Sequence, residues 1–152
     1  MIGSGANVVF NGAVESYTFT TFRVKGFHLH EIKVVGPIDL RVRIPLYHET
    51  LRHSLPPHYF CIIDNSAGHE NTVTFEDIRL LDNILLEGGI EFYYGAIISK
   101  DQGYPNIIKL AEENLYTVGI KNELLQVEDR PSAEAFINQK IAEVAALRDR
   151  KA

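Results

Sequence analysis

Five consecutive apolar residues, Tyr59-Phe60-Cys61-Ile62-Ile63, place the strongest restriction on how this chain can fold. A strand with one face in water alternates between apolar and polar residues, whereas a continuously apolar strand is covered on both faces, as in parallel sheets flanked by helices. Pro56-Pro57 precedes the run and polar residues 64–66 follow it. We therefore predict a central strand over residues 59–63 and a fold of the α/β class.

Two segments upstream have the pattern of an antiparallel hairpin. Residues 17–24 (YTFTTFRV) are dense in aromatic and β-branched residues, and residues 27–35 (FHLHEIKVV) alternate with a period of two. The two residues between them, Lys25-Gly26, are the length of a tight hairpin turn. We predict a loose leader over residues 1–16, with a short strand at Val8-Val9-Phe10.

Downstream of the hairpin, helix and strand patterns alternate. We predict helices over residues 45–55, 74–87, 105–118 and 131–147, and further strands over residues 90–98 and 123–127. Thr74 stands three residues before Asp77, as in a capping box, and Gly88-Gly89 marks the end of that helix.

The predicted order is β-β-α-β-α-β-α-β-α. Crossovers from strand through helix to strand join parallel neighbours. The expected architecture is a mixed, mostly parallel sheet with four helices packed on it. Residues 17–147 form a single α/β domain in this interpretation, and residues 148–152 form a charged C-terminal tail.

Composition restricts the class of function. The net charge is −5 and the basic residues are scattered, which argues against a general nucleic-acid binder. The single cysteine, Cys61, excludes an internal disulfide, and its apolar surroundings predict a buried, unreactive thiol. Because no apolar run is long enough to span a bilayer and no signal-peptide pattern is visible, we expect a cytoplasmic protein without membrane insertion. Nothing in the sequence indicates a cofactor.

Three local patterns carry a resemblance to a known family. They are VVGPID (Val34–Asp39), YFCIIDNS (Tyr59–Ser66) and LLQVEDRPSAEAFI (Leu124–Ile137). With the element order, they make residues 20–147 resemble the STAS domain of bacterial anti-sigma-factor antagonists and sulfate-transporter tails, in particular its SpoIIAA-like set. The resemblance implies a non-enzymatic regulatory or protein-interaction domain of a bacterial circuit. Its partner would be another protein, bound at or near the loop after the central strand.

The resemblance also raises the question of a phosphorylation switch. In phosphorylatable members, a serine in an Asp-Ser-Ser-Gly-like motif lies at the N-terminus of the helix after the central strand, where a phosphate is stabilised by free backbone N–H groups. Here Thr72 and Thr74 are near that place, but the motif is missing, and Glu76 and Asp77 would repel a phosphate. We favour helix capping by Thr74. The expected interaction or phosphorylation loop comprises Asp64, Asn65, Ser66, Thr72 and Thr74.

A second interpretation places chemistry beyond the C-terminal ends of the parallel strands, where open α/β sheets bind ligands. The residues that would form this crevice are Asp64, Ser66, Ser99 and Lys100. It would make the chain a small-ligand-binding or enzymatic domain, or a receiver-like domain phosphorylated on Asp64. A receiver also pairs acids near its phosphoacceptor, and Asp39 is the nearest candidate here. We favour a simpler role, in which Asp64 and Asn65 accept backbone N–H bonds in a turn.

Two further features have both a functional and a structural interpretation. His28 and His30 lie two apart on one strand face, a workable spacing for two metal ligands, but no third ligand is identifiable and we predict no metal site. The aromatic residues of the predicted strands, Phe19, Phe22, Phe27, Tyr93 and Tyr94, are expected to enrich the side of the sheet with fewer helices. An exposed patch of that kind would mark a homodimer interface or a docking surface.

Overall fold

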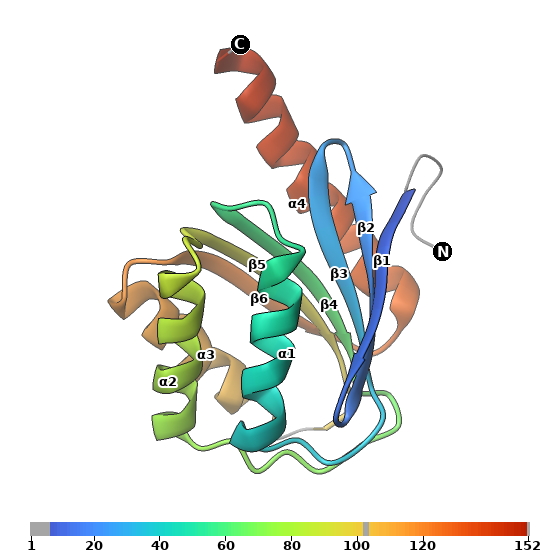
Figure 1. Ribbon diagram of the computed structural model, residues 1–152, viewed down its shortest axis with the longest axis vertical. Coiled ribbons are helices and arrows are strands. Elements are labelled where there is room, and N and C mark those ends of the chain that lie inside the picture. Colours follow the sequence, from blue (N-terminus) through green and yellow to red (C-terminus); the bar gives the residue numbers. More distant parts are fainter. Residues whose placement is uncertain (1–6, 102–103, 152) are drawn as a thin grey trace.

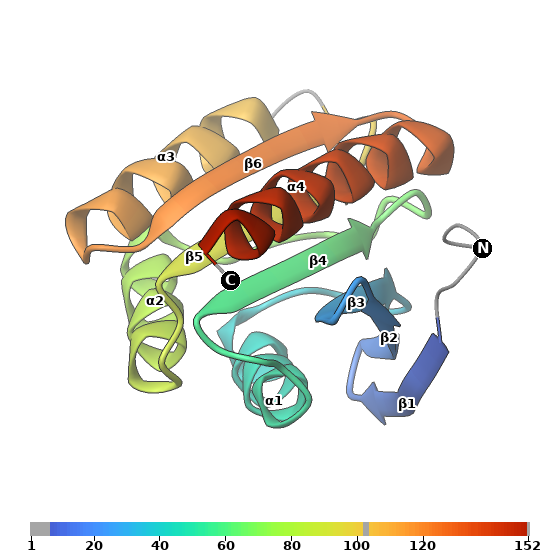
Figure 2. The same ribbon diagram turned by 90° about the horizontal axis from the view of Figure 1, so that it is seen from above.

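The computed structural model describes the backbone of residues 7–101 and 104–151, and the side chains of these residues except 104–107 and 151. The strands are β1 (Asn7–Val14), β2 (Tyr17–Val24), β3 (Phe27–Val34), β4 (His58–Asp64), β5 (Phe92–Ile98) and β6 (Lys121–Val127). The helices are α1 (Leu40–Arg52), α2 (Phe75–Glu87), α3 (Tyr104–Thr117) and α4 (Arg130–Lys151). They form three layers, with α1, α2 and α3 on one face of the sheet and α4 on the other (Figures 1 and 2).

The strands lie in the sheet in the order of the chain, from β1 at one edge to β6 at the other. The pairs β1–β2 and β2–β3 are antiparallel, and the pairs from β3 to β6 are parallel. The prediction of a mixed, mostly parallel sheet with four helices packed on it is thus confirmed. The turn Lys25-Gly26 has positive φ at both positions, 52° and 83°, which suits the tight turn of a right-twisted hairpin.

The central strand β4 explains the apolar run at residues 59–63. Tyr59 and Cys61 are buried on the side of α1, α2 and α3, whereas Phe60 and Ile62 are buried under α4. Each face of this strand is therefore covered by helices, as the sequence predicts. Burial raises the pKa of the Cys61 thiol to about 11, so the thiol stays protonated and unreactive.

The first described segment is more ordered in structure than the sequence indicates. Residues 7–14 form β1, which pairs with β2 along its length apart from a register shift between Val8 and Phe10. The sequence predicts only a short strand inside a loose leader, because Asn11 and Gly12 are weak strand formers. A Cβ at Gly12 would lie 2.6 Å from the ring of Phe19, so the glycine makes room for that ring. Residues 1–6 of the predicted leader lie outside the described part of the chain.

Helix α1 begins five residues earlier than predicted. The Asp39 carboxylate accepts a hydrogen bond of 3.0 Å from the N–H of Val42 and caps the helix, which therefore begins at Leu40. Pro45 is inside the helix and not in its first turn, so the prediction of the start at Pro45 was wrong. Leu55, the last residue of the predicted helix, lies beyond the observed end at Arg52 and is exposed.

Helix α4 also continues past its predicted end. It runs from Arg130 to Lys151, through the segment expected to be a charged tail. Arg148 donates a hydrogen bond of 2.9 Å to the carbonyl of Lys25, and its guanidinium lies 4.9 Å from the ring centroid of Phe27. The helix end is thus attached to the hairpin turn, a contact between distant segments that the local charge pattern cannot reveal.

The expected aromatic surface is not formed. Phe19 and Tyr93 are buried on the side of α1, α2 and α3, and Phe27 is buried under α4. Phe22 and Tyr94 are only partly exposed. The prediction of an aromatic patch was wrong because helices cover Phe19, Phe27 and Tyr93, so the homodimer stays a prediction without that support. Across the described residues, no helix combines the length and the hydrophobicity needed to cross a membrane.

Candidate functional site

A polar groove of about 330 Å³ lies where α4 leaves the sheet uncovered. Helix α4 packs over β4, β5 and β6 and covers the start of β3, so the same face of β1, β2 and the end of β3 remains open beside the start of the helix (Figure 2). The groove is lined by Asn11, Gly12, Thr18, Phe19, Thr20, Glu31, Ile32, Lys33, Asp64 and Arg130.

Strand alternation places the polar residues in this groove. Tyr17 and Phe19 of β2 point to the core, so Thr18 and Thr20 point to the opposite face. In β3 the same alternation turns Glu31 and Lys33 toward the groove. Lys33 is the register partner of Asp64 on β4, which brings the end of the central strand to the same place.

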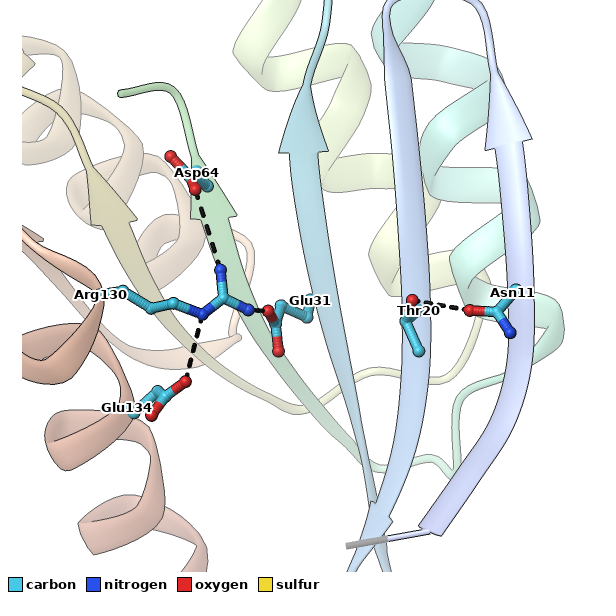
Figure 3. A network of polar contacts seen from close by, with 6 residues as sticks. All are labelled: Asn11, Thr20, Glu31, Asp64, Arg130 and Glu134. Carbon is cyan, nitrogen blue, oxygen red and sulfur yellow. Dashed lines mark hydrogen bonds and ion pairs between the residues drawn. The ribbon is translucent and has the colours of Figure 1, made fainter. Parts of the chain in front are cut away.

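Arg130 is the central residue of the groove (Figure 3). As the first residue of α4, it extends its guanidinium toward the sheet, where it forms an ion pair with Glu31 of β3. A second ion pair joins it to Asp64 at 3.8 Å, and its Nε donates to Glu134 in the next turn at 3.2 Å. One guanidinium is therefore shared by three carboxylates from three separate elements.

This cluster has an excess of negative charge. Glu31, Asp64 and Glu134 face Arg130 and the nearby Lys33, and the side chains of Glu31 and Asp64 are only 13% and 17% exposed. Oε2 of Glu31 is buried and has no hydrogen-bond partner among the described residues. A buried carboxylate oxygen without a donor is destabilising, so an additional donor or cation in the groove would be favourable.

The opposite wall of the groove offers neutral polar groups. Thr20 Oγ1 donates a hydrogen bond of 2.8 Å to Oδ1 of Asn11, which joins β2 to β1 across the groove floor (Figure 3). The bond occupies the carbonyl end of the Asn11 side chain and leaves its amide N–H groups to donate. Together with Thr18, these residues can both donate and accept hydrogen bonds.

The loop after the central strand is organised by its own polar side chains. Asp64 accepts a hydrogen bond of 2.9 Å from the N–H of Ser66. Asn65 is buried, and its side chain accepts from the N–H of His69 and donates to the His69 carbonyl, each at 3.0 Å. Asp64 and Asn65 thus have the turn role that the sequence favours, while the remaining edge of Asp64 faces Arg130.

The residues of the alternative crevice do not all meet. Of Asp64, Ser66, Ser99 and Lys100, only Asp64 lines the polar groove. Ser99 is buried, and its Oγ accepts a hydrogen bond of 3.1 Å from the N–H of Asp101. Asp39, the acid expected to assist a phosphoacceptor, caps α1. The geometry therefore gives Asp64 an ion pair with Arg130, with Glu31 and Lys33 as neighbours in the groove, in place of the hydroxyl and lysine of the predicted site.

The two candidate threonines are engaged in structural contacts. Thr74 Oγ1 accepts a hydrogen bond of 3.2 Å from the N–H of Asp77, and Asp77 accepts one of 3.0 Å from the N–H of Thr74. This reciprocal pair is the capping box that the sequence indicates. Thr72 Oγ1 donates to the carbonyl of Ile38 at 3.3 Å. Phosphorylation of either residue stays a prediction.

Replacing Thr74 with alanine is expected to lower the free energy of unfolding by about 1 kcal/mol, because the N–H of Asp77 loses its acceptor. Thr74→Ser keeps the hydroxyl and is the matched control, with an expected change of a few tenths of a kcal/mol. Urea denaturation of the three proteins measures both differences. Equal stability of Thr74→Ala and wild type would show that the capping box is not needed.

The two histidines considered as metal ligands are engaged in other contacts. His28 Nδ1 lies 2.6 Å from the carbonyl oxygen of His53. His30 is buried, with Thr21 Oγ1 at 2.8 Å from one ring nitrogen and Ser54 Oγ at 2.7 Å from the other. In the part of the chain that the structure describes, no group of three His, Cys, Asp or Glu residues is placed to hold a metal ion.

Sequence reasoning missed Glu31, Arg130 and Glu134 as members of a site. Glu31 is one polar residue in the alternating pattern of β3, and Arg130 and Glu134 belong to an ordinary polar helix start. No local motif connects them. The one available signal was the spacing of Arg130 and Glu134 by four positions, which predicts an ion pair on one helix face but not its third and fourth members.

Comparison with known proteins gives a likeness in fold. No known family profile and no curated protein matches the sequence. The crystal structure of an uncharacterized protein of the DUF3478 family from Shewanella loihica PV-4, described as having a SpoIIAA-like fold, aligns with a TM-score of 0.50. The alignment covers 84% of this chain and 98% of that chain. This chain has a SpoIIAA-like fold. At 16% sequence identity the likeness concerns the fold alone, and it confirms the fold that the three local patterns implied.

Proposed function

We propose that this SpoIIAA-like domain is a non-enzymatic, cytoplasmic protein-interaction domain, and that its polar groove binds a partner segment carrying a lysine or arginine. One observation carries the proposal: three carboxylates share Arg130, and Oε2 of Glu31 is buried without a donor. The regulatory part of the proposal, including a bacterial circuit as its setting, rests on the STAS resemblance.

A basic side chain suits the groove on grounds of charge and hydrogen bonding. Its N–H groups would reach Glu31 and Asp64, supply the missing donor and offset the excess negative charge. Hydrogen bonds of an ionised pair in a partly buried groove are stronger than those at an open surface. Thr18, Thr20 and Asn11 would bind the main chain of the same segment from the other wall.

Arg130 makes the groove selective. In the free domain its guanidinium occupies part of the space between Glu31 and Asp64. A partner must therefore share the carboxylates with Arg130, and an acidic segment, or one without donors, would leave Oε2 of Glu31 unpaired, while a neutral donor would not offset the negative charge. Discrimination then comes from a buried polar group that only the correct partner satisfies.

Peptide selection tests the proposal and does not require the partner to be identified. A random peptide library displayed on phage is selected against the immobilised full chain, and the affinity of the enriched peptides is measured by calorimetry. We expect enrichment of peptides with Lys or Arg. The double variant Glu31→Gln, Asp64→Asn is expected to bind them at least about 100-fold more weakly, because each of the two lost bonds to a charged group contributes about 1.5–3 kcal/mol.

Glu113→Gln is the control, since Glu113 is exposed on α3, on the opposite side of the sheet from α4. It removes one of the two negative charges that the double variant loses, at a site remote from the groove, and is expected to leave the affinity unchanged. Thermal melts of all variants verify that they are folded. The proposal fails if the enriched peptides have no basic residues, or if the double variant binds them as tightly as wild type does.

A further inference from the structure

A second cavity, separate from the groove, lies inside the layer of α1, α2 and α3. Its volume is about 90 Å³, and it lies between these helices and the sheet. The walls are mainly apolar and include Leu46, Ile78, Leu81, Ile97, Ile108 and Leu115. Among the described residues that line the cavity, only Arg43 and Asp82 carry a formal charge.

The guanidinium of Arg43 has fewer partners than its charge requires. One of its Nη atoms donates a hydrogen bond of 2.9 Å to Oη of Tyr47, the residue one turn later in α1. Its Nε is buried and has no hydrogen-bond partner among the described residues. An arginine remains protonated under all ordinary conditions, so a cation faces an apolar cavity with a donor that is not used.

Asp82 does not neutralise this cation by direct contact. Its carboxylate accepts a hydrogen bond of 2.5 Å from Nδ2 of Asn114, which links α2 to α3. No ion pair between Arg43 and Asp82 is present among the described residues, although both line the cavity. In the described part of the chain, the partly buried guanidinium has no carboxylate in direct contact, and an anion that enters the cavity would supply one.

The size and lining of the cavity indicate the kind of anion. One water-sized site takes about 10–15 Å³ of cavity volume. The 90 Å³ cavity therefore has room for at least roughly six non-hydrogen atoms. A planar carboxylate matches the fork of a guanidinium, and the apolar walls suit a short hydrocarbon chain. The hydroxyls of Tyr47 and Tyr93, 3.5 Å apart, lie beside the guanidinium and can donate to a second oxygen.

We propose that this cavity binds a short-chain monocarboxylate, whose carboxylate contacts Arg43 and whose hydrocarbon chain lies against the apolar walls. The site is independent of the groove, since it is on the other face of the sheet and shares no lining residue with it. It would give the interaction domain a means to respond to a small metabolite of this chemical class.

The test is a titration with butyrate, followed by NMR chemical shifts of the full chain and by calorimetry. Butyramide has the same shape without the charge, and butylammonium has the opposite charge. We expect butyrate to shift the amide signals of cavity residues such as Leu81 and Leu115, and to bind at least 10-fold more tightly than either analogue. No shift at these residues, or equal binding of butyrate and butyramide, would overturn the proposal.

Variants separate the role of Arg43 from general stability. Arg43→Met keeps a long apolar stem without the charge and is expected to reduce butyrate affinity at least 10-fold. Arg41→Met is the matched control, because Arg41 is exposed on the same helix. Ala111→Leu is expected to fill the cavity and prevent binding while Arg43 is kept. Unchanged affinity in Arg43→Met, or in Ala111→Leu with its fold intact, would place the ligand elsewhere.

Discussion

Replacing His30 with glutamine is expected to remove the largest acid-sensitive contribution to the stability of this fold. His30 is fully buried in β3, and burial, with smaller contributions from the nearby His28 and His53, lowers its pKa from 6.5 to about 3. The unfolded chain therefore binds a proton at this position below pH 6.5, whereas the folded chain does so only near pH 3. The free energy of unfolding falls as the pH is lowered through this window.

Hydrogen bonds explain why the neutral ring is held. Ser54 Oγ donates to the carbonyl of Thr50 at 2.8 Å, so it accepts the hydrogen bond from Nε2 of His30. Nδ1 of the neutral ring then accepts from the hydroxyl of Thr21. A proton on Nδ1 would require Thr21 to turn its hydroxyl away and would place a charge in the core.

The expected size of the effect follows from the shift in pKa. Each pKa unit corresponds to 1.36 kcal/mol, so the histidine contributes a loss of about 2 kcal/mol by pH 5 and about 4–5 kcal/mol by pH 3. Urea denaturation at intervals between pH 7 and pH 4 measures it. As the pH is lowered, the free energy of unfolding of His30→Gln is expected to fall less steeply than that of wild type, whatever the stability of the variant at pH 7.

His48→Gln is the control, since His48 is exposed on α1. The free energy of unfolding of this variant should change with pH in the same way as that of wild type. Parallel curves for wild type and His30→Gln would contradict the expectation and would mean that the ring is charged, or solvated, in the folded protein.

Replacing Asp82 with asparagine is expected to stabilise the protein near neutral pH. Burial raises the pKa of Asp82 from 3.8 to about 6, despite the opposing effects of Asn114 and Arg43. The folded state therefore holds a proton between pH 3.8 and about 6 that the unfolded state has released. Stability contributed by this residue is present at low pH and is lost as the pH rises to about 6.

Asparagine removes the charge and keeps a carbonyl that accepts the hydrogen bond from Asn114. We expect Asp82→Asn to be more stable than wild type by about 3 kcal/mol at pH 7 and above, with the difference vanishing near pH 4. The pH dependence has the opposite sign to that of His30, so urea denaturation of the two variants separates the contributions.

Asp149→Asn, at an exposed site near the end of α4, is the control and should show no such gain in stability. A less stable Asp82→Asn at pH 7, or a gain independent of pH, would contradict the expectation.

Local patterns were sufficient where the physical cause is itself local. The alternation in residues 27–34 predicted the second hairpin strand, because the side chains of a strand alternate between its faces. Thr74 and Asp77 predicted the start of α2, because the capping box involves residues three positions apart. The central strand at residues 59–63 followed from apolar residues that both faces must bury.

Local patterns failed where a distant contact decides the structure. Strand β1 is held by pairing with β2, and the end of α4 is held by the hydrogen bond from Arg148 to the carbonyl of Lys25. Neither result can be predicted from the hydrophobic period of the segment.

The candidate sites show the same division between local and distant causes. The sequence predicted Asp64 as a polar residue at the end of the central strand, and its side chain lies in the groove. Arg130, which pairs with it, and Glu31, which pairs with the same guanidinium, come from the start of α4 and from β3, and only parallel pairing and the packing of α4 bring them together. Chain order and burial patterns are properties of single segments, whereas a binding site depends on the positions of several segments in space. The fold class could therefore be predicted from the residues alone, while the groove and the cavity at Arg43 became visible only in the packed structure.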